Sequence, residues 1–391
     1  MMKVLHIIPS ISKKRGGPSI AVLKMARALR SEGIDVSILS TSDNSTYCDC
    51  EYPISQWFMI EGIPTLMFRP LNSRVRFIRE YLVSPSLMCW LARNISNYDA
   101  IHVHSIFSST STFAMVIARL NNIPYLIRTI GQLNSWSLAQ SKFRKRLMLT
   151  LIEKSNLTSS LAVHVTSDTE LSDLNSLGIY RNVICLQLGV NYPQINKLRT
   201  RPSGEPVRFI FLSRIHPKKQ LNQLLAACSL LNEKCIDKNW LLSISGDGEE
   251  EYVRNMKQLT DDYGICDKVL WTGHIDGEAK ANLLSKADWF ILPSASENFG
   301  IAAVEALAYG VPVIITREVG ISDSVLEYKA GIICDSDPVN LFQVLQEALD
   351  GPSGAMRNAA RKLAHDKYSW QTIAKELASF YNANIPLRTR S

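Results

Sequence analysis

Short apolar segments alternate with amphipathic, helix-like segments along most of this chain of 391 residues. Apolar runs of about four to eight residues are typical of buried parallel strands, and the segments between them are typical of helices that cover the sheet. The pattern predicts strands at residues 4–8, 35–40, 100–105, 125–130, 161–167, 208–213, 240–246, 268–273, 289–294 and 312–316. The sequence therefore predicts an α/β protein with Rossmann-like, doubly wound parallel sheets.

The strand-and-helix pattern is interrupted at residues 191–206, which lack periodicity and are rich in Pro, Asn and basic residues. A segment of this kind is typical of a linker, and the chain is long enough for two hydrophobic cores. We expect a domain at 1–195, a second domain at 206–369, and a final helix at about 370–391 that packs back on the first domain. The two domains are expected to face each other across a ligand-binding cleft at the carboxyl ends of their strands.

The composition is that of a globular protein, with 46% hydrophobic and 20% charged residues. No apolar stretch approaches the roughly 20 residues that a helix needs to span a bilayer, and the apolar start of the chain is too short for a signal peptide. The eight cysteines show no Cys-x-x-Cys spacing, and Cys48 and Cys50 have no second pair beside them. Free thiols in a reducing compartment are the better interpretation, so we expect a cytoplasmic protein.

Positive charge is concentrated in the first half of the chain. Residues 1–200 hold 22 Lys/Arg and 12 Asp/Glu, whereas the remainder holds 21 and 24. The segments 74–85 and 141–154 combine basic with apolar residues, and the second contains Lys142, Arg144, Lys145 and Arg146. Such a helix either packs on a sheet or rests on anionic lipid. The surplus charge favours lipid, and a peripheral contact with the inner face of the plasma membrane is expected.

A glycine pair follows the first predicted strand and precedes a helix that is expected to begin near Pro18. Gly16 and Gly17 allow the backbone to approach a ligand closely, and the helix N-terminus offers N–H donors to an anion. The third glycine of the dinucleotide-binding fingerprint is missing. Taken alone the pair is therefore a weak signal, because it is more often an ordinary turn.

Two cations follow the first strand of the second half, in the segment LSRIHPKKQL at 212–221. Arg214 offers a planar fork of donors and Lys219 a mobile point charge, a combination that suits a diphosphate. The alternative is a solvated basic loop.

The segment ENFGIAAVE at 297–305 follows a buried strand and a polar turn, and a helix is expected to begin around Phe299. Gly300 permits a phosphate to approach the first-turn N–H groups. Glu297 precedes the helix, and Glu305 would lie roughly 12 Å away if the spacing were fully helical. Two carboxylates so placed suit a nucleotide sugar, one for sugar hydroxyls and one for ribose hydroxyls. The alternative is an ordinary capped amphipathic helix.

Several motifs together resemble those of the retaining glycosyltransferase family 4, the glycosyl-transferases group 1 class. They are GGPS, SRIHPKK, GDGEEEY, GHIDGEAKANLLSKADWFILPSASENFGIAAVEALAYGVPVI and YSW. The resemblance covers nearly the whole chain and is strongest over 207–335. It implies a GT-B fold and transfer of a sugar from a nucleotide-diphosphate donor with retention of configuration, by front-face attack and without a metal or other cofactor.

The resemblance also implies roles for individual residues. Glu297 would contact hydroxyls of the donor sugar and Glu305 the ribose, while Arg214 and Lys219 would neutralise the departing diphosphate. The reacting centre would comprise Glu297, Arg214, Lys219 and His104. The donor-binding set would be Gly16, Gly17, Arg128, Arg214, Lys219, Gly273, His274, Ile275, Glu297, Asn298, Phe299, Gly300, Ile301 and Glu305.

His102 and His104 lie two apart on a predicted strand and so share a face. His104 is the one that resembles the family histidine facing the donor, and His102 is interpreted as a core or supporting residue. A metal site would need a third ligand, which the sequence does not identify. The acidic segment at 335–337 is interpreted as a helix N-cap at Asp337, not as a metal-binding motif.

Two positions depart from the family pattern. Ile130 stands where members often carry His or Arg, and Arg128, two residues back on the same predicted strand, is expected to replace the missing cation. The alternative is that Arg128 is a buried structural ion-pair partner and that Ile130 lines an apolar acceptor pocket. Gln220 stands where glycine usually follows the lysine.

The sequence therefore predicts a metal-independent hexosyltransferase that acts on a glycan or lipid-linked acceptor in surface or exopolysaccharide synthesis, with UDP-glucose as the first candidate donor. The alternatives are another GT-B enzyme, such as a nucleotide-sugar 2-epimerase or a phosphorylase, and a basic nucleic-acid-binding protein. A nucleic-acid-binding protein would explain the positive charge but not the Glu297–Glu305 segment, and no basic, aromatic-rich motif is present.

Overall fold

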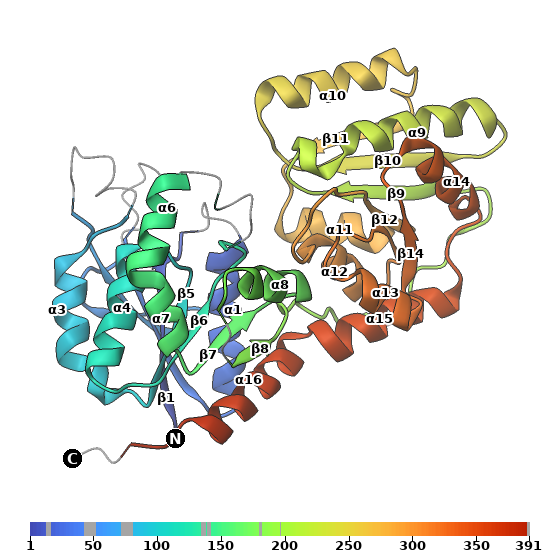
Figure 1. The fold of residues 1–391 in the computed structure, drawn as a ribbon. Coiled ribbons are helices and arrows are strands. Elements are labelled where there is room, and N and C mark those ends of the chain that lie inside the picture. Colours follow the sequence, from blue (N-terminus) through green and yellow to red (C-terminus); the bar gives the residue numbers. More distant parts are fainter. Residues whose placement is uncertain are drawn as a thin grey trace. The chain divides into compact units, whose positions relative to one another are not determined.

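A computed structural model describes residues 1–12, 17–42, 52–71, 81–133, 138, 142–179, 182–195 and 197–388. Gly16, Cys48, Cys50 and most of 74–85 lie outside these segments. The chain divides into two compact units (Figure 1). Unit 1 comprises Met1–Gly189 and Trp370–Ser391, and unit 2 comprises Val190–Ser369.

Unit 1 is built on an eight-stranded sheet in the order β3-β4-β2-β1-β5-β6-β7-β8. The strands are β1 (Lys3–Ser10), β2 (Asp35–Thr41), β3 (Trp57–Ile60), β4 (Ile63–Phe68), β5 (Ala100–His104), β6 (Tyr125–Arg128), β7 (Ala162–Val165) and β8 (Val183–Cys185). The helical segments are α1 (Gly17–Ser31), α3 (Pro85–Asn94), η2 (Ile95–Asn97), α4 (Ser109–Leu120), α6 (Lys142–Met148), η3 (Leu149–Glu153), α7 (Lys154–Ser159), α8 (Asp168–Ser176) and α16 (Trp370–Asn384).

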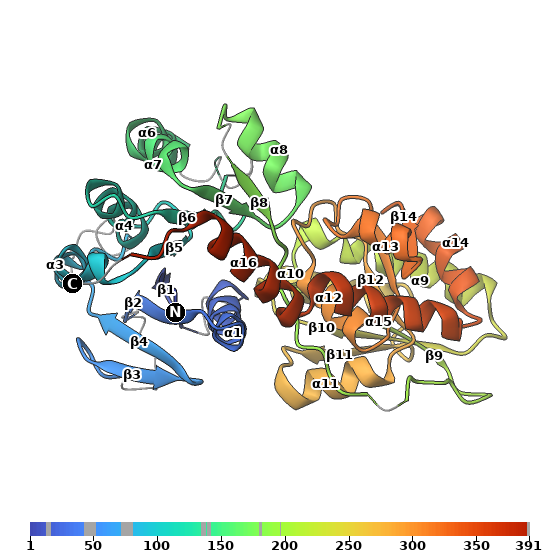
Figure 2. The ribbon, with the colours of Figure 1, turned by 90° about the horizontal axis from the view of Figure 1, so that it is seen from below.

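Helices cover both faces of this sheet, as Figure 2 shows. Alternate side chains of β1 enter different cores: Val4 and Ile8 pack with α1 and α16, whereas Leu5 and Ile7 pack with α3 and α4. A strand buried on both faces must be apolar on both, which explains the continuous apolar runs in the sequence. The terminal helix α16 belongs to unit 1 because Leu377 and Tyr381 are fully buried in the core that this helix shares with α1 and the sheet.

One hairpin departs from the predicted all-parallel arrangement. Strands β3 and β4 pair antiparallel, whereas the other strand pairs described in this sheet are parallel. The two-residue turn between them is Glu61–Gly62, with φ of 49° and 81°. Positive φ at both positions is the geometry that matches the twist of a tight hairpin. The apolar pattern gave no strand prediction at 57–68, and the short strands β8 and β14 were also missed.

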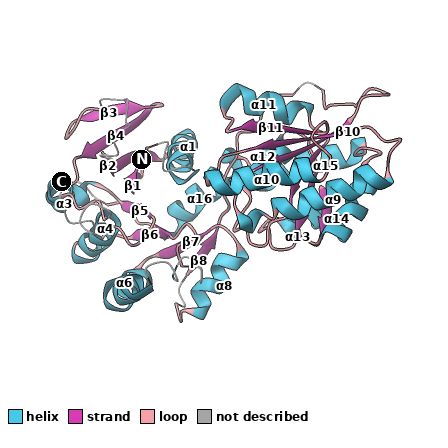
Figure 3. Cartoon of the chain, turned by 90° about the horizontal axis from the view of Figure 1, so that it is seen from above, coloured by secondary structure: helices cyan, strands magenta, loops and turns pink. Residues whose placement is uncertain are grey.

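Unit 2 contains a six-stranded parallel sheet in the order β11-β10-β9-β12-β13-β14. Figure 3 shows its strands in magenta and the helices beside them in cyan. The strands are β9 (Val207–Leu212), β10 (Trp240–Ser245), β11 (Val269–Gly273), β12 (Trp289–Leu292), β13 (Val313–Thr316) and β14 (Gly331–Cys334). The helical segments are η4 (Pro217–Lys219), α9 (Leu221–Lys234), α10 (Glu250–Asp262), α11 (Gly277–Lys286), α12 (Ile301–Ala308), α13 (Ser322–Tyr328), α14 (Pro338–Ala348) and α15 (Gly354–Tyr368).

The strand order of unit 2 reverses direction between β9 and β12, which are hydrogen-bonded neighbours. In doubly wound folds the loops that leave such a pair of strands diverge, and their carboxyl ends form a ligand-binding crevice. The two most specific sequence motifs, at 212–221 and 297–305, follow β9 and β12 respectively. The predicted α/β class is confirmed, and the topology brings these two motifs to one edge of one sheet.

No helix in the described part of the chain is long and apolar enough to cross a bilayer. The cysteines that the structure describes are free thiols.

Candidate functional site

A pocket of 790 Å³ lies at the carboxyl ends of the central strands of unit 2. The loops after β9, β10 and β11 form one side, and α11 and α12 contribute the rest. Its lining residues are Leu212, Ser213, Arg214, Gly246, Asp247, Gly248, Glu249, His274, Ile275, Lys280, Ala302 and Glu305. The pocket therefore brings together four of the residues predicted from the sequence: Arg214, His274, Ile275 and Glu305.

Two glycines let the β9 and β10 loops touch through their backbones. A Cβ atom on Gly246 would lie 1.9 Å from the carbonyl oxygen of Ser213, and one on Gly248 would lie 2.2 Å from that of Ile215. The amide of Ile215 donates to the carbonyl of Asp247 at 2.8 Å. Only glycine fits such an approach. The Gly-Asp-Gly segment thus fixes the backbone on both sides of Arg214.

The β9 loop is ordered around Lys219 by His216. The Nδ1 atom of His216 accepts from the amide of Lys218 at 3.2 Å, and its carbonyl accepts from the amide of Lys219 at 2.8 Å. The Nζ of Lys219 then forms an ion pair with Glu297 of the β12 loop. The side chains of Lys219 and Glu297 are 16% and 22% exposed, so the pair is only partly screened by water. His216 was not singled out in the sequence, although its place before a proline is an N-cap signal.

The helix after β12 begins at Ile301, not around Phe299 as expected. Gly300 is its N-cap and has φ of 81°, a left-handed conformation that favours glycine. The ring of Phe299 packs against Tyr368 with ring centroids 5.5 Å apart, so this side chain belongs to the core. Because helical residues begin after Gly300, the fully helical spacing considered for Glu297 and Glu305 does not apply.

Glu297 is held in position through its backbone. Its amide donates to the carbonyl of Glu318 at 3.0 Å, and its carbonyl accepts from the amide of Gly320 at 3.0 Å. The loops after β12 and β13 are therefore joined at this residue. The carboxylate is left to the ion pair with Lys219.

Glu305 makes a second ion pair that the sequence did not predict. Lys280 of α11 donates to both carboxylate oxygens, at 2.8 and 2.9 Å. No sequence signal distinguished Lys280 from the other charged residues of its helix, because the contact joins two helices that are distant in sequence. The remaining predicted residues of unit 2 do not line the main pocket, although Gly273 lines a neighbouring pocket of 410 Å³.

Two of the residues predicted in unit 1 are almost completely buried. His104 is 0% exposed and Arg128 is 1% exposed, while Gly17 is the first residue of α1. The expectation that Ile130 and Arg128 share a strand face is wrong. Strand β6 ends at Arg128, and Ile130 has φ of 53°, so the alternation of a strand does not extend to it. The side chain of Glu170 accepts from the amide of Gly131 at 2.7 Å and so organises this turn.

The structure supplies the third histidine that the sequence did not identify. One nitrogen atom from each of His6, His102 and His104 lies within 4.8 Å of the others, all in the described segments. At the other acidic candidate, Asp337 accepts from the amides of Val339 and Asn340 at 3.1 and 3.0 Å. The predicted N-cap is therefore confirmed.

Comparisons with known proteins agree with this architecture. The family model for glycosyl transferases group 1 matches residues 195–367, and the model for the glycosyl transferase 4-like domain matches residues 16–186. A glycogen synthase of Mycobacterium tuberculosis is 24% identical over 295 residues, which cover 73% of this chain and 69% of that protein. A D-inositol 3-phosphate glycosyltransferase of an Arthrobacter species is 24% identical over 396 residues, which cover 95% and 90%.

Among solved structures, the Anabaena protein HepE in complex with UDP has a TM-score of 0.73 and 16% identity, over 98% of this chain and 100% of that chain. The two sheets and these matches define a glycosyltransferase enzyme with the GT-B fold. The two family models together span both units, and the chain belongs to the glycosyl transferases group 1, as its motifs predicted.

Proposed function

We propose that this protein is a retaining, metal-independent glycosyltransferase that uses a nucleoside diphosphate hexose as donor, with UDP-glucose as the first candidate. The observation that carries this proposal is the pocket of unit 2, where the cation Arg214 lies in one cavity with the carboxylate of Glu305. HepE, which shares the fold, has been solved with UDP and with UDP-glucose, and this supports a uridine nucleotide.

The chemistry assigned to each residue follows from the charges that develop during transfer. The bond from sugar C1 to the diphosphate oxygen breaks, a bond from C1 to the acceptor oxygen forms on the same face, and the acceptor proton passes to the diphosphate. Arg214 and Lys219 stabilise the negative charge that gathers on the leaving group. Glu297 accepts hydrogen bonds from hydroxyls of the sugar, and Glu305 accepts them from the ribose.

The ion pair of Lys219 with Glu297 has a consequence for binding. In the absence of ligand, each group neutralises the other. A bound donor offers phosphate oxygens to Lys219 and hydroxyl groups to Glu297, so both charges acquire new partners at once. The ion pair therefore neutralises both charges in the free enzyme. Its loss on binding lowers the affinity for the donor by a small amount.

For the acceptor, we propose a glycan or a lipid-linked glycan of surface or exopolysaccharide synthesis. Apolar side chains are exposed beside the cations Lys145 and Arg146 on α6 and η3: Leu147 is 49% exposed and Leu151 is 67% exposed. An apolar stripe flanked by basic residues suits the surface of an anionic membrane. This supports a cytoplasmic enzyme that contacts the inner face of the plasma membrane.

Flotation with vesicles tests the membrane contact. Vesicles of phosphatidylglycerol should bind the protein in a salt-sensitive manner, and vesicles of phosphatidylcholine should not. Replacing Lys145 and Arg146 by Gln should weaken binding. The same change at Arg254 and Lys257, which are exposed on α10 of unit 2, should leave it unaltered. Equal binding to both lipids, or to neither, rejects the proposal.

A panel of nucleotide sugars tests the enzymatic proposal. The purified protein is supplied with UDP-, GDP- and ADP-hexoses, and release of the nucleoside diphosphate is followed with and without an extract of lipid-linked glycans. One donor should be consumed faster in the presence of acceptor, and the product should keep the anomeric configuration of the donor. Conversion of the sugar nucleotide to an epimer, with no diphosphate released, would support the 2-epimerase alternative instead.

A further inference from the structure

A row of polar side chains is buried on one face of the unit 1 sheet. His6, His102, His104, Arg128 and His164 lie on four adjacent strands and are 0–1% exposed. In the register of the sheet, His6 is opposite His102, His104 is opposite Arg128, and Arg128 is opposite His164. The apolar side chains on the same face, such as Val4 and Ile8, pack with α1 and α16. Buried polar groups are costly unless they are hydrogen-bonded, so the bonds that they make can be traced completely.

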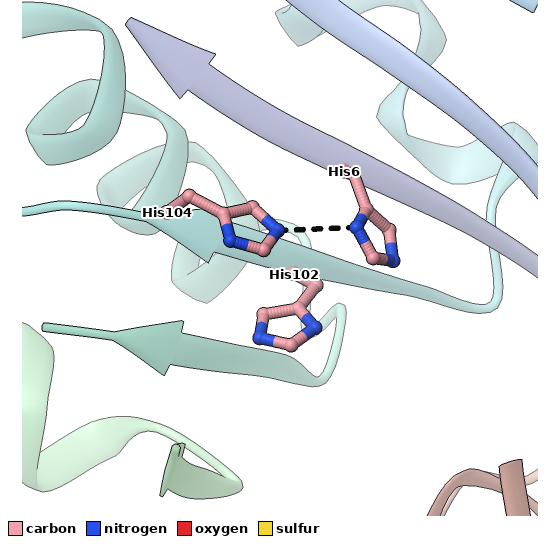
Figure 4. A group of neighbouring side chains, drawn as sticks. All are labelled: His6, His102 and His104. Carbon is pink, nitrogen blue, oxygen red and sulfur yellow. Dashed lines mark hydrogen bonds between the residues drawn. The ribbon is translucent and has the colours of Figure 1, made fainter. Parts of the chain in front are cut away.

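Hydrogen bonds connect the four imidazoles through one phenol. The Nε2 of His164 lies 2.8 Å from the carbonyl oxygen of Leu186, and its Nδ1 lies 3.4 Å from Nε2 of His102. The Nδ1 of His102 lies 2.7 Å from the hydroxyl of Tyr381, on α16. That hydroxyl lies 3.5 Å from Nε2 of His6. The Nδ1 of His6 lies 3.1 Å from Nε2 of His104 (Figure 4).

The carbonyl of Leu186 sets the direction of this chain, because a carbonyl only accepts. His164 must therefore carry its proton on Nε2, which leaves a lone pair on Nδ1. His102 must donate to that lone pair from Nε2, so its own Nδ1 accepts from the hydroxyl of Tyr381. With its proton committed to His102, the phenol oxygen accepts from Nε2 of His6.

The last step reaches His104. His6 has its proton on Nε2, so its Nδ1 is a lone pair that accepts from Nε2 of His104. The Nδ1 of His104 is then a lone pair as well, and this atom is buried without a hydrogen-bond partner among the described residues. The hydrogen bonds cannot run in the opposite direction. In that case Nε2 of His102 would be a lone pair and would face the lone pair on Nδ1 of His164.

We infer that Tyr381, His6, His102 and His164 are positioning residues that hold His104 with its proton on Nε2 and present its Nδ1 lone pair to a hydroxyl group of the substrate. A lone pair can bind a ligand hydroxyl, which donates, but not a phosphate oxygen, which only accepts. His104 is therefore assigned to a sugar hydroxyl, of donor or acceptor, and not to the diphosphate. The role of His104 at the substrate rests on the proposed function, whereas the protonation of the chain does not.

The charges in this region agree with the inference. Burial, assisted by the nearby charge of Arg128, lowers the pKa of His6 and of His164 to about 3. Burial also lowers the pKa of His102 and of His104 well below the usual range. Each imidazole is thus neutral near pH 7 and carries a single proton. The Nε and Nη1 of Arg128, on the strand next to His104, are also without partners among the described residues.

A metal ion is the competing use of these histidines. A bound metal ion would require a lone pair from each of His6, His102 and His104 at one point. In the series of hydrogen bonds, however, the His102 lone pair accepts from Tyr381 and the His6 lone pair accepts from His104. A divalent cation would also lie close to the guanidinium of Arg128, which repels it. The two uses exclude each other, and this makes them separable by experiment.

The test is nuclear magnetic resonance of the full chain with ¹⁵N-labelled histidine. The chain has seven histidines, so single His→Gln variants assign the ring signals. Two-bond correlations between ring protons and nitrogens distinguish a protonated from an unprotonated ring nitrogen. All four buried histidines should carry the proton on Nε2 at pH 7. A proton on Nδ1 of His104 or of His164 would overturn the inference. So would a stoichiometric Zn²⁺ content, after dialysis against Zn²⁺, that is lost in His6→Gln.

The variant Tyr381→Phe separates positioning from simple packing. This variant keeps the aromatic ring but removes the hydroxyl that links His102 to His6. His164 and His102 should therefore stay protonated on Nε2, while His6 and His104 become free to move their protons to Nδ1. The matched control is Tyr125→Phe, which removes another buried hydroxyl of unit 1, one that donates to the carbonyl of Asn156 at 2.7 Å. The control should lower stability to a similar extent and change no histidine. Unchanged signals of His6 and His104 in Tyr381→Phe would overturn the inference.

Transfer kinetics complete the test. With the donor found in the nucleotide-sugar panel, Tyr381→Phe should lower kcat while the Kd of the free nucleoside diphosphate stays within about twofold, because the variant lies in unit 1. Unaltered kcat, with altered histidine signals, would overturn the assignment of His104 to a substrate hydroxyl. If the wild-type protein consumes no nucleotide sugar, the proposed function fails, but the Nε2 protonation is still measured independently.

Discussion

Lys280 holds both carboxylate oxygens of Glu305, at 2.8 and 2.9 Å, across the gap between α11 and α12. Both side chains are partly buried, 29% and 24% exposed, and both line the unit 2 pocket. The carboxylate that is proposed to bind ribose hydroxyls is therefore fixed in orientation before any ligand arrives. Its negative charge is also compensated, which matters because the expected ligand is itself an anion.

The first prediction concerns this pair. Lys280→Met leaves the Glu305 carboxylate without its cation beside the incoming diphosphate, so the Kd of UDP should rise by about tenfold, equivalent to about 1.4 kcal/mol. Isothermal titration measures this directly. Lys286→Met, an exposed lysine in the last turn of the same helix, is the control and should leave the Kd unaltered. An unchanged Kd in Lys280→Met would show that the pair does not serve nucleotide binding.

The second prediction separates the two glutamates. Glu297→Ala removes the proposed contact to the reacting sugar, and kcat should fall by on the order of a hundredfold or more. The Kd of UDP should not rise in this variant, because Lys219 loses its ion-pair partner and is free to bind the diphosphate. Glu318→Ala is the control, since Glu318 holds Glu297 only through its backbone carbonyl. Full activity of Glu297→Ala would refute the assignment.

The third prediction concerns the leaving group. Arg214→Ala and Lys219→Ala should each reduce kcat/KM by an amount equivalent to about 2–4 kcal/mol, because each removes a positive charge from the developing diphosphate. Lys218→Ala, one residue away, should have a much smaller effect. EDTA should leave the activity unaltered. Activity that is lost with EDTA and restored by Mg²⁺ would contradict the metal-independent mechanism.

Much of the fold could be predicted because parallel strands buried on both faces leave continuous apolar runs in the sequence. The position of the two motifs after β9 and β12 was also predictable, because ligand-binding segments in such folds follow the strands at the switch point. Lys280 was not predictable, because its contact with Glu305 depends on the packing of two helices. The role proposed for His6 could not be predicted for a similar reason: only the sheet register places this residue opposite His102. The error at Ile130 arose because a strand was assumed to continue through a left-handed turn.

The fourth prediction concerns Gln220, which has φ of 54° and precedes α9. A left-handed conformation costs a residue with a Cβ atom roughly 1 kcal/mol, which glycine avoids. Gln220→Gly should therefore raise the free energy of unfolding of unit 2 by about 0.5–1 kcal/mol, less the contribution of its side-chain bond to the carbonyl of Pro217. Gln223→Gly, the same exchange in the first turn of α9, should lower it by a similar amount. Urea unfolding followed by hydrogen exchange in β9 and β10 measures both.

The buried histidines make unit 1 sensitive to acid. In the folded chain the pKa of His6 and of His164 is about 3, whereas an unfolded histidine has a pKa of about 6.5. Between these values the unfolded chain binds more protons than the folded chain, so acid favours unfolding. The stability that neutral burial allows is present above pH 6.5 and is lost progressively as the pH falls towards 3.

The last prediction follows from this difference. Each of the two histidines should lower the free energy of unfolding of unit 1 by about 1.4 kcal/mol for each pH unit below 6.5. Hydrogen exchange of the β5 and β7 amides at pH 7, 6 and 5, corrected for the intrinsic exchange rate, reports this free energy for unit 1. His164→Gln should flatten the slope by about one histidine's share even if the variant is less stable at pH 7, because the slope counts protons and not contacts. His274→Gln, at an exposed position of unit 2, should leave the slope as it is. A slope that His164→Gln does not change would mean that His164 carries a second proton, and hence a positive charge, in the folded protein. Its Nδ1 would then donate, which contradicts the proposed direction of the hydrogen bonds from Leu186 to His104.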